Sequence, residues 1–233
     1  MVIVPLAAVR KKEERKQARK ERIKNRLKSI IKNDKSIFHY RNMRGNMICL
    51  QQGIRKGKEG KPMNKIKIYL DTSVISYLDQ MDVPEQVKET QEVWELFKKG
   101  LYEIYISDVV VYEINKCSGE KRKTLLDYLD RIEYNIIETD EGTVELAEKF
   151  IDFGFLKRKS YDDCRHIAAA ILAGCDFIIS WNFKHIVNVR TIRGIKAITT
   201  YEGYKDLMIY PPSALLGEED EDYGSDDKGT GDQ

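Results

Sequence analysis

Four acidic residues stand where short apolar segments give way to polar sequence, and their carboxylates could together bind a metal ion. Asp71 directly follows the segment IKIYL, and Glu113 lies a few residues beyond the segment IYI. Asp162 and Asp163 stand side by side before an apolar segment. Carboxylates that converge in a desolvated cleft repel one another by roughly several kcal/mol, and a hard cation such as Mg²⁺ or Mn²⁺ removes that cost. A bound ion lowers the pKa of water and can neutralise a phosphodiester during in-line attack.

Each acid also has a purely structural explanation. Asp71 could cap the helix that follows it. Glu113 could be a half-exposed helical residue that pairs with Lys116 at i+3. Asp162 and Asp163 suit the positive end of a helix dipole, although two adjacent acids exceed what the dipole needs. Taken singly, none of these residues establishes a site.

The spacing of apolar residues predicts the elements that would position the acids. Short apolar strands alternate with helices, which is typical of βαβ units, so the expected fold class is α/β. We expect three α/β/α layers around a parallel, Rossmann-like sheet of about five strands, with a site at the carboxyl ends of the strands. Strands are predicted at 66–70, 104–106, 134–137, 177–180 and 195–199. Helices are predicted at 72–80, 108–116 and 161–173, with others opened by Pro84, marked by the stripe Leu125, Leu126, Leu129 and Ile132, and capped by Thr139 or Asp140.

Some predictions concern the ends and faces of these helices. Ser107 can cap the helix 108–116. Gly174 is the expected terminator of the helix 161–173. Val144 is expected on the inward face of the helix that follows Asp140.

Four motifs follow one another along the chain. They are YLDTSVISYLDQ at 69–80, Glu113 in VVVYEI, Asp163 in DDCRHIAAA, and IISWNFKHI at 178–186. Together they resemble the PIN-domain family, and most closely the VapC-type toxins of bacterial and archaeal toxin–antitoxin pairs. The resemblance covers about Lys65 to Leu216. No motif is specific alone, whereas four in family order on an alternating βα pattern are.

The resemblance implies a role for each matching residue. Asp71 would be the metal ligand after the first strand, Glu113 the second acid, and Asp163 the third, which leaves Asp162 in a flanking position. Many members carry a fourth Asp where this chain has Asn182. The substitution removes one charge, so the affinity of any second metal ion is in question. Mg²⁺ or Mn²⁺ would be the cofactor, and cleavage would leave a 5′-phosphate and a 3′-hydroxyl.

Several neighbouring residues could contribute to the site, and some of them could pack in the core instead. Thr72 and Ser180 could orient a water or a carboxylate. His166 could pack in the core or contact substrate, and His185 could close a turn. Trp181 could stack on a splayed RNA base or pack in the core. Lys184, Arg165 and Arg190 could bind phosphates near the site.

The resemblance also implies partners: an RNA substrate, a small antitoxin protein and a second copy of the chain. Endoribonuclease activity as the toxin of a type II pair is the first hypothesis. A non-catalytic RNA- or partner-binding module that keeps the fold is the second, and Asn182 favours it. A PIN nuclease that acts in RNA processing outside a toxin pair is the third.

Charge divides the 233 residues into unlike parts. Residues 1–65 contain 20 Lys and Arg against 5 Asp and Glu, whereas the remainder contains 20 against 33. We predict a basic extension and linker at 1–62, with a short amphipathic helix near 23–31, then a nuclease-like domain at 63–216 and an acidic disordered tail at 217–233. The extension could bind nucleic acid, contact an acidic surface such as the tail, or result from the choice of start site, since Met63 begins a typical family start.

Composition argues against a membrane span, a signal peptide and a zinc site. No apolar run reaches the roughly 18 residues that a bilayer span needs, and Met1 to Val9 precede the basic residues instead of following them, unlike a signal peptide. We therefore expect a cytoplasmic protein without membrane contact. The four cysteines lack CxxC spacing and only three histidines are present, so a zinc site is not expected.

Overall fold

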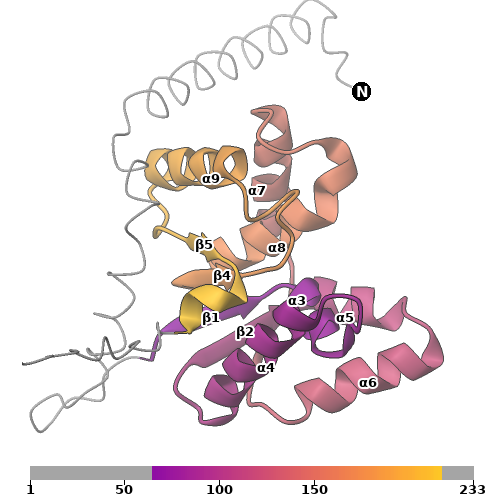
Figure 1. Ribbon diagram of the computed structural model, residues 1–233. Coiled ribbons are helices and arrows are strands. Elements are labelled where there is room, and N and C mark those ends of the chain that lie inside the picture. The colour runs from indigo at the N-terminus through magenta and orange to yellow at the C-terminus, as the bar shows by residue number, and fades with distance from the viewer. Residues whose placement is uncertain (1–64, 217–233) are drawn as a thin grey trace, which may run out of the picture.

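The computed structural model describes residues 65–216 (Figure 1). The predicted extension with its helix near 23–31, and the predicted acidic tail, lie outside the described residues. Within the described range the chain forms a parallel sheet between two layers of helices, so the predicted α/β fold class with three layers and five strands is confirmed. None of the helices in this range combines the length and apolar character that crossing a membrane requires.

The sheet has five strands in the order β3-β2-β1-β4-β5, and every pairing is parallel. The central strands are apolar on both faces, as a sheet covered by helices on both sides requires, and Ile68, Tyr69 and Leu70 are fully buried. After β1 the chain adds β2 and then β3 on one side of that strand. It then returns and adds β4 and β5 on the other side. The strands are β1 (Lys67–Leu70), β2 (Glu103–Ser107), β3 (Asn135–Ile137), β4 (Phe177–Ile179) and β5 (Met208–Tyr210).

The helices divide between the two faces according to this change of direction. Figure 1 shows α3 to α6 on one side of the sheet and α7 to α9 on the other. The boundary between β1 and β4 is therefore a topological switch point, where crevices form at the carboxyl ends of parallel strands. The helices are α3 (Thr72–Ser76, continued by a 3-10 turn at Tyr77–Asp79), α4 (Pro84–Lys98), α5 (Asp108–Asn115), α6 (Gly119–Leu129), α7 (Glu141–Asp152), α8 (Tyr161–Leu172) and α9 (Val189–Glu202).

The strand predicted at 195–199 is wrong, because this segment lies within α9. The Asn188 side chain accepts from the backbone N–H of Thr191 and caps the helix. Ile195 and Ile198 are buried three residues apart, which is helical spacing. The short apolar run resembled a strand because a buried helix segment and a buried strand have the same composition.

Two further predictions about helix faces differ from the structure. Leu126 and Val144, both expected to face inward, are 40% and 43% exposed. Each lies at the border of an apolar stripe whose other members supply the buried contacts. Asp140, by contrast, caps α7 as predicted, with a reciprocal capping box to Thr143.

Candidate metal centre

Asp71 lies at the switch point of the sheet. It follows β1, and its backbone N–H donates to the carbonyl of Ile179 at the end of β4, at 3.1 Å. Its side chain makes no capping bond to α3, although the residue occupies the N-cap position. Instead the carboxylate Oδ2 accepts from the hydroxyls of Ser73 at 2.5 Å and Ser180 at 2.7 Å. The carboxylate is thus oriented by two hydroxyls at the crevice, and its other oxygen, Oδ1, takes no part in these bonds.

Glu113 reaches the same end of the sheet from α5, and its side chain is 28% exposed. Its Oε2 accepts from the Thr72 hydroxyl, at the start of α3, and from His166 Nε2 at 3.2 Å. The residue expected to pair with it, Lys116, lies 3.9 Å from the ring centre of Tyr112. Burial raises the pKa of the Glu113 carboxyl, but the hydrogen bonds from His166 and Thr72 and the nearby positive charge outweigh burial, so the pKa is lowered. The ionised form is favoured.

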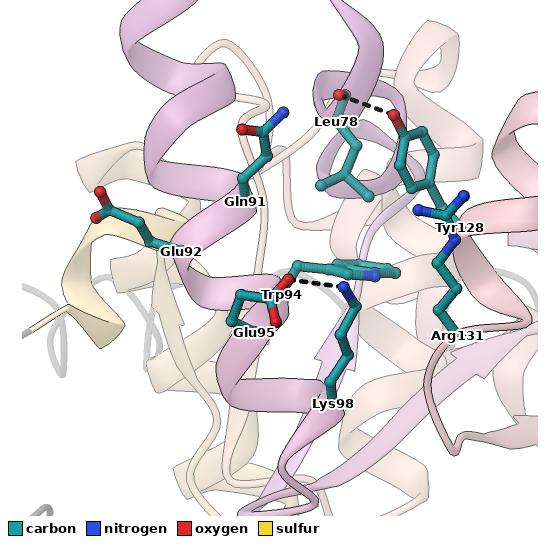
Figure 2. A pocket seen from close by; sticks show the side chains of 8 residues that line it. All are labelled: Leu78, Gln91, Glu92, Trp94, Glu95, Lys98, Tyr128 and Arg131. Atoms are coloured by element: carbon teal, nitrogen blue, oxygen red, sulfur yellow. Dashed lines mark hydrogen bonds and ion pairs between the residues drawn. The ribbon is translucent and has the colours of Figure 1, made fainter.

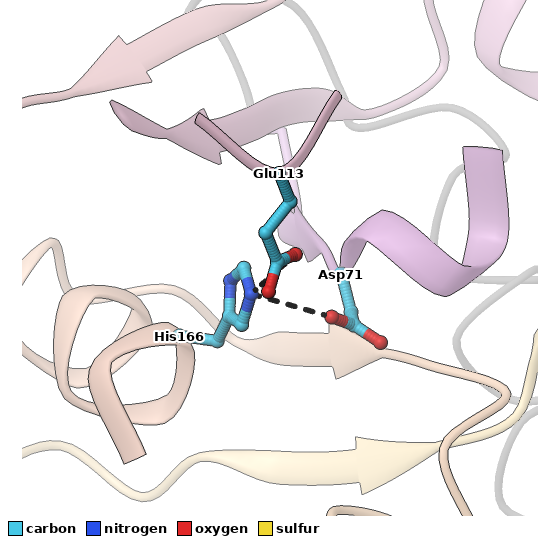
Figure 3. A group of neighbouring side chains, drawn as sticks. All are labelled: Asp71, Glu113 and His166. Atoms are coloured by element: carbon cyan, nitrogen blue, oxygen red, sulfur yellow. Dashed lines mark hydrogen bonds and ion pairs between the residues drawn. The ribbon is translucent and has the colours of Figure 1, made fainter. Parts of the chain in front are cut away.

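Nε2 of His166 faces both acids (Figure 3). The ring is 1% exposed, and Nε2 lies 3.2 Å from Glu113 Oε2 and 3.6 Å from Asp71 Oδ1. Nδ1 is 2.7 Å from the hydroxyl of Tyr69. Burial lowers the pKa of the imidazole, but the hydrogen bond to Glu113 and the surrounding negative charges raise it above its ordinary value. Ligand atoms of Asp71, Glu113 and His166 all lie within 4.8 Å of one another.

Asp163 lies on α8, one turn before His166. It borders the group formed by Asp71, Glu113 and His166 but is not part of it. Its Oδ1 accepts from the side-chain amide of Asn182 at 2.8 Å. Burial, and then the negative charge of Asp71, raise the pKa of the Asp163 carboxyl. Asp162 next to it points elsewhere: it is 47% exposed and lies 3.6 Å from Arg165.

Asn182 is held by the turn that follows β4. Its backbone N–H donates to the Ser180 hydroxyl at 2.9 Å, and its side-chain oxygen accepts from the backbone N–H of His185 at 3.0 Å. Only its Nδ2 faces Asp163. An Asp here could not donate that bond, so Asn182 suits a site in which burial and the charge of Asp71 already disfavour the ionised form of Asp163.

The donor set fits a hard divalent cation. The hydrogen bonds described above engage Oδ2 of Asp71 and Oε2 of Glu113. Oε1 takes no part in them, and Oδ1 makes only the 3.6 Å contact with His166, so both could still bind a ligand. Carboxylate oxygens are the usual ligands of Mg²⁺ and Mn²⁺, and the partly buried crevice would strengthen their interaction with a cation. Ser73, Thr72 and Ser180 supply the outer hydrogen bonds that orient such ligands.

The other residues that the sequence offered as contacts for substrate pack in the core or make hydrogen bonds within the protein. Trp181 is 6% exposed, donates from Nε1 to Thr90 at 2.8 Å and stacks on Tyr77, so it packs in the core and presents no face to a base. Arg165 donates to Thr139, and Arg190 donates to the carbonyl of Gly154. His185 closes the turn after β4, as one prediction had it.

Sequence reasoning missed the roles of Tyr69, Ser73 and Ser107. Ser107 occupies the N-cap position of α5 but makes no capping bond, and its hydroxyl lies 2.7 Å from that of Tyr69. Ser73 could have been predicted as a hydrogen-bond partner of Asp71, because it stands two residues after it. For His166, which follows Asp163 by one helical turn, packing in the core and contact with substrate were the two predicted roles; it is buried, but it also bonds to Glu113.

A separate hollow lies between α4 and α6, away from the acids (Figure 2). Its volume is about 430 Å³, and its lining includes Leu78, Trp94, Tyr128 and Arg131. The indole N–H of Trp94 is buried there without a hydrogen-bond partner among the described residues. No residue of the metal centre contributes to this hollow.

No family model matches the chain, and no curated protein matches it. Among solved structures, the chain is similar to one in the crystal structure of VapBC2 from Rickettsia felis bound to a DNA fragment from the promoter. The two chains are 17% identical with a TM-score of 0.40, and the match covers 63% of this chain and 98% of the other. Similarity of this degree establishes neither a shared family nor a shared activity, so the function is inferred from the site itself.

Proposed function

We propose that this protein is a divalent-metal-dependent endoribonuclease of the VapC toxin type. The observation that carries the proposal is the closeness of Asp71 and Glu113 at the sheet's switch point, with Asp163 beside them. The order of the sequence motifs from 69 to 186 supports the same interpretation.

Asp71, Glu113 and Asp163 would hold the cation, Mg²⁺ or Mn²⁺. When bound, the ion would lower the pKa of a water and offset negative charge on a phosphodiester. Asp71 and Glu113 need no reorganisation to act as ligands, because hydroxyls already fix one oxygen of each. Asp163 would also gain from the ion, since burial and the negative charge of Asp71 disfavour its charged form before binding.

Asn182 would act through Asp163. Its amide fixes one carboxylate oxygen of Asp163 without adding charge. A site with three carboxylates and one amide carries less negative charge than a site with four acids. It therefore favours one tightly bound ion over two.

The proposed partners follow from the motif resemblance. The substrate would be RNA, cleaved to leave a 5′-phosphate and a 3′-hydroxyl. A small antitoxin protein would hold the enzyme inactive, and the toxin would act as a homodimer.

The test is cleavage of RNA by the full chain with Mg²⁺ or Mn²⁺. We expect EDTA to abolish cleavage and Asp71→Asn to lower it by more than about 100-fold, because loss of an outer-shell partner alone costs about 10- to 100-fold. Asp162→Asn is the matched control: it removes a neighbouring exposed acid and should leave cleavage unchanged. Activity that survives both EDTA and Asp71→Asn contradicts the proposal.

Expression in a bacterial host tests the toxin role. Growth arrest by the wild type but not by Asp71→Ala, with new RNA ends mapped in the same cells, supports it. Cleavage in vitro without growth arrest would favour a nuclease of RNA processing outside a toxin pair. A gene for a small antitoxin beside the gene of this protein would favour the toxin role over the role in RNA processing.

Asn182 favours a second candidate, a module that binds RNA or a protein partner without cleaving. This candidate predicts RNA binding with no turnover in Mn²⁺ at any pH from about 6 to 9. It also predicts that Asp71→Asn leaves binding unchanged.

A further inference from the structure

A chain of buried hydrogen-bonding groups leads from the sheet to the metal centre. The Ser107 hydroxyl on β2 lies 2.7 Å from the Tyr69 hydroxyl on β1, and that hydroxyl lies 2.7 Å from His166 Nδ1 on α8. All three residues are at most 1% exposed. The imidazole is therefore anchored at Nδ1 by the buried hydroxyl of Tyr69.

Anchoring at Nδ1 directs the other ring nitrogen at Glu113. Nε2 lies 3.2 Å from Glu113 Oε2, the same oxygen that accepts from Thr72. Nε2 carries a hydrogen in the neutral tautomer that accepts from Tyr69 and also in the protonated ring, so it donates in both states. Two donors from different elements thus converge on one oxygen of a long, rotatable side chain.

We propose that His166 is a positioning residue for Glu113, and that Tyr69 acts on Glu113 only through His166. By holding Oε2, His166 keeps Oε1 turned to the crevice, where the cation would bind. The inference rests on the proposed function, because it assigns Glu113 a metal-binding role. It adds to that function a residue outside the set of carboxylate ligands.

Burial and geometry favour positioning over contact with substrate. His166 is enclosed by the side chains of Tyr69, Glu113 and Asp71 and has 1% of its surface exposed, so an RNA phosphate cannot reach the ring. Fixing a ligand by an outer hydrogen bond is a recognised determinant of metal affinity, typically worth about 10- to 100-fold. A role limited to packing would change stability but leave the affinity of the folded protein for metal unchanged.

The experiment measures Mn²⁺ binding to the full chain by calorimetry, without RNA. The variants are His166→Gln, Tyr69→Phe and the double variant, with folding of each checked by circular dichroism. We expect each single variant to bind Mn²⁺ about 10- to 100-fold more weakly. The double variant should bind no more weakly than His166→Gln, because Tyr69 acts through His166. Tyr128→Phe, which removes a phenol bonded to the Leu78 carbonyl, is the matched control and should not change affinity.

Paramagnetic resonance of bound Mn²⁺ separates positioning from direct ligation. The proposal expects no nitrogen coupling of the strength that a ligating imidazole produces. Strong coupling in the wild type that disappears in His166→Gln would overturn it, as would unchanged affinity in folded Tyr69→Phe. If His166→Gln does not fold, Tyr69→Phe decides the matter. Normal Mn²⁺ binding with the expected losses, but without RNA cleavage, would contradict the proposed function and leave this inference standing.

Discussion

Asn182 donates a hydrogen bond from its side-chain amide to the carboxylate of Asp163, over 2.8 Å. The bond joins the turn after β4 to the first turn of α8. Asp163 needs this donor, because burial and the charge of Asp71 both disfavour its ionised form. The amide therefore stabilises the metal-free site at a position where the resemblance implies a fourth acid.

Replacing the amide by an acid should destabilise the protein when no metal is present. Asn182→Asp removes the donor and places a like charge beside Asp163, and a lost bond to a charged group costs about 1.5–3 kcal/mol. We expect the melting temperature in EDTA to fall by several degrees, since 1 kcal/mol corresponds to about 2–4 °C in a domain of 150–250 residues. Excess Mn²⁺ should reverse much of the loss.

Asn188→Asp is the control for this variant. Asn188 caps α9 by accepting from the backbone of Thr191, and an Asp caps equally well. The substitution also loses the bond from Nδ2 to the Lys184 carbonyl, but that bond is exposed and its acceptor is uncharged, so the melting temperature should stay nearly unchanged in EDTA and in Mn²⁺. Equal effects of the two substitutions would show that the interaction between residues 182 and 163 is not the cause.

Asp163→Asn should abolish cleavage and yet stabilise the metal-free fold. Because folding raises the pKa of this carboxyl, the folded state binds a proton more readily than the unfolded state, and the carboxylate lowers stability as pH rises through that interval. The Asn oxygen can still accept from Asn182. Melting temperatures in EDTA should therefore be higher than wild type at pH 8, with the difference vanishing toward pH 3. A difference independent of pH would contradict the raised pKa.

Much of the fold followed from apolar spacing alone. Alternation of short apolar strands with helices was enough to predict the parallel sheet, and the strand ends placed Asp71 at its carboxyl edge. The error at 195–199 arose where composition does not distinguish a buried helix from a buried strand. The deciding signals, an Asn188 cap and helical spacing from Thr191 to Ile198, lie mostly outside the run that resembled a strand.

The site was less predictable than the fold. Contact between His166 and Glu113 joins residues 53 positions apart, and it depends on how α8 and α5 pack at the crevice. No local pattern encodes that distance. Ser107 illustrates the same limit, because its position before a helix suggested a cap, whereas its hydroxyl bonds to Tyr69 on a neighbouring strand.

Close packing at Gly194 should make α9 intolerant of any side chain there. A Cβ at this position would lie 2.3 Å from Cγ of Phe155, so Gly194→Ala forces the ring or the helix to move. Overpacking of this kind costs about 1–3 kcal/mol, more than the roughly 1 kcal/mol that Ala gains over Gly in a helix. We expect a lower midpoint in urea. Gly119→Ala, where nothing lies within 4 Å, is the control and should be neutral or slightly stabilising.

The ion pair between His166 and Glu113 should give the metal-free protein a maximum of stability in mildly acidic solution. The raised pKa of His166 adds stability that is fully present below its ordinary value of 6.5 and is lost as pH rises through the folded value. The lowered pKa of Glu113 adds stability that is present above its ordinary value of 4.5 and is lost as pH falls through the folded value.

Unfolding in urea with EDTA, from pH 3 to 9, measures this dependence of stability on pH. In His166→Gln the decline above pH 6.5 should shrink, because the group whose protonation stabilises the fold is gone. If stability declines by the same amount in that variant, other groups cause the decline, and this result would contradict the raised pKa of His166.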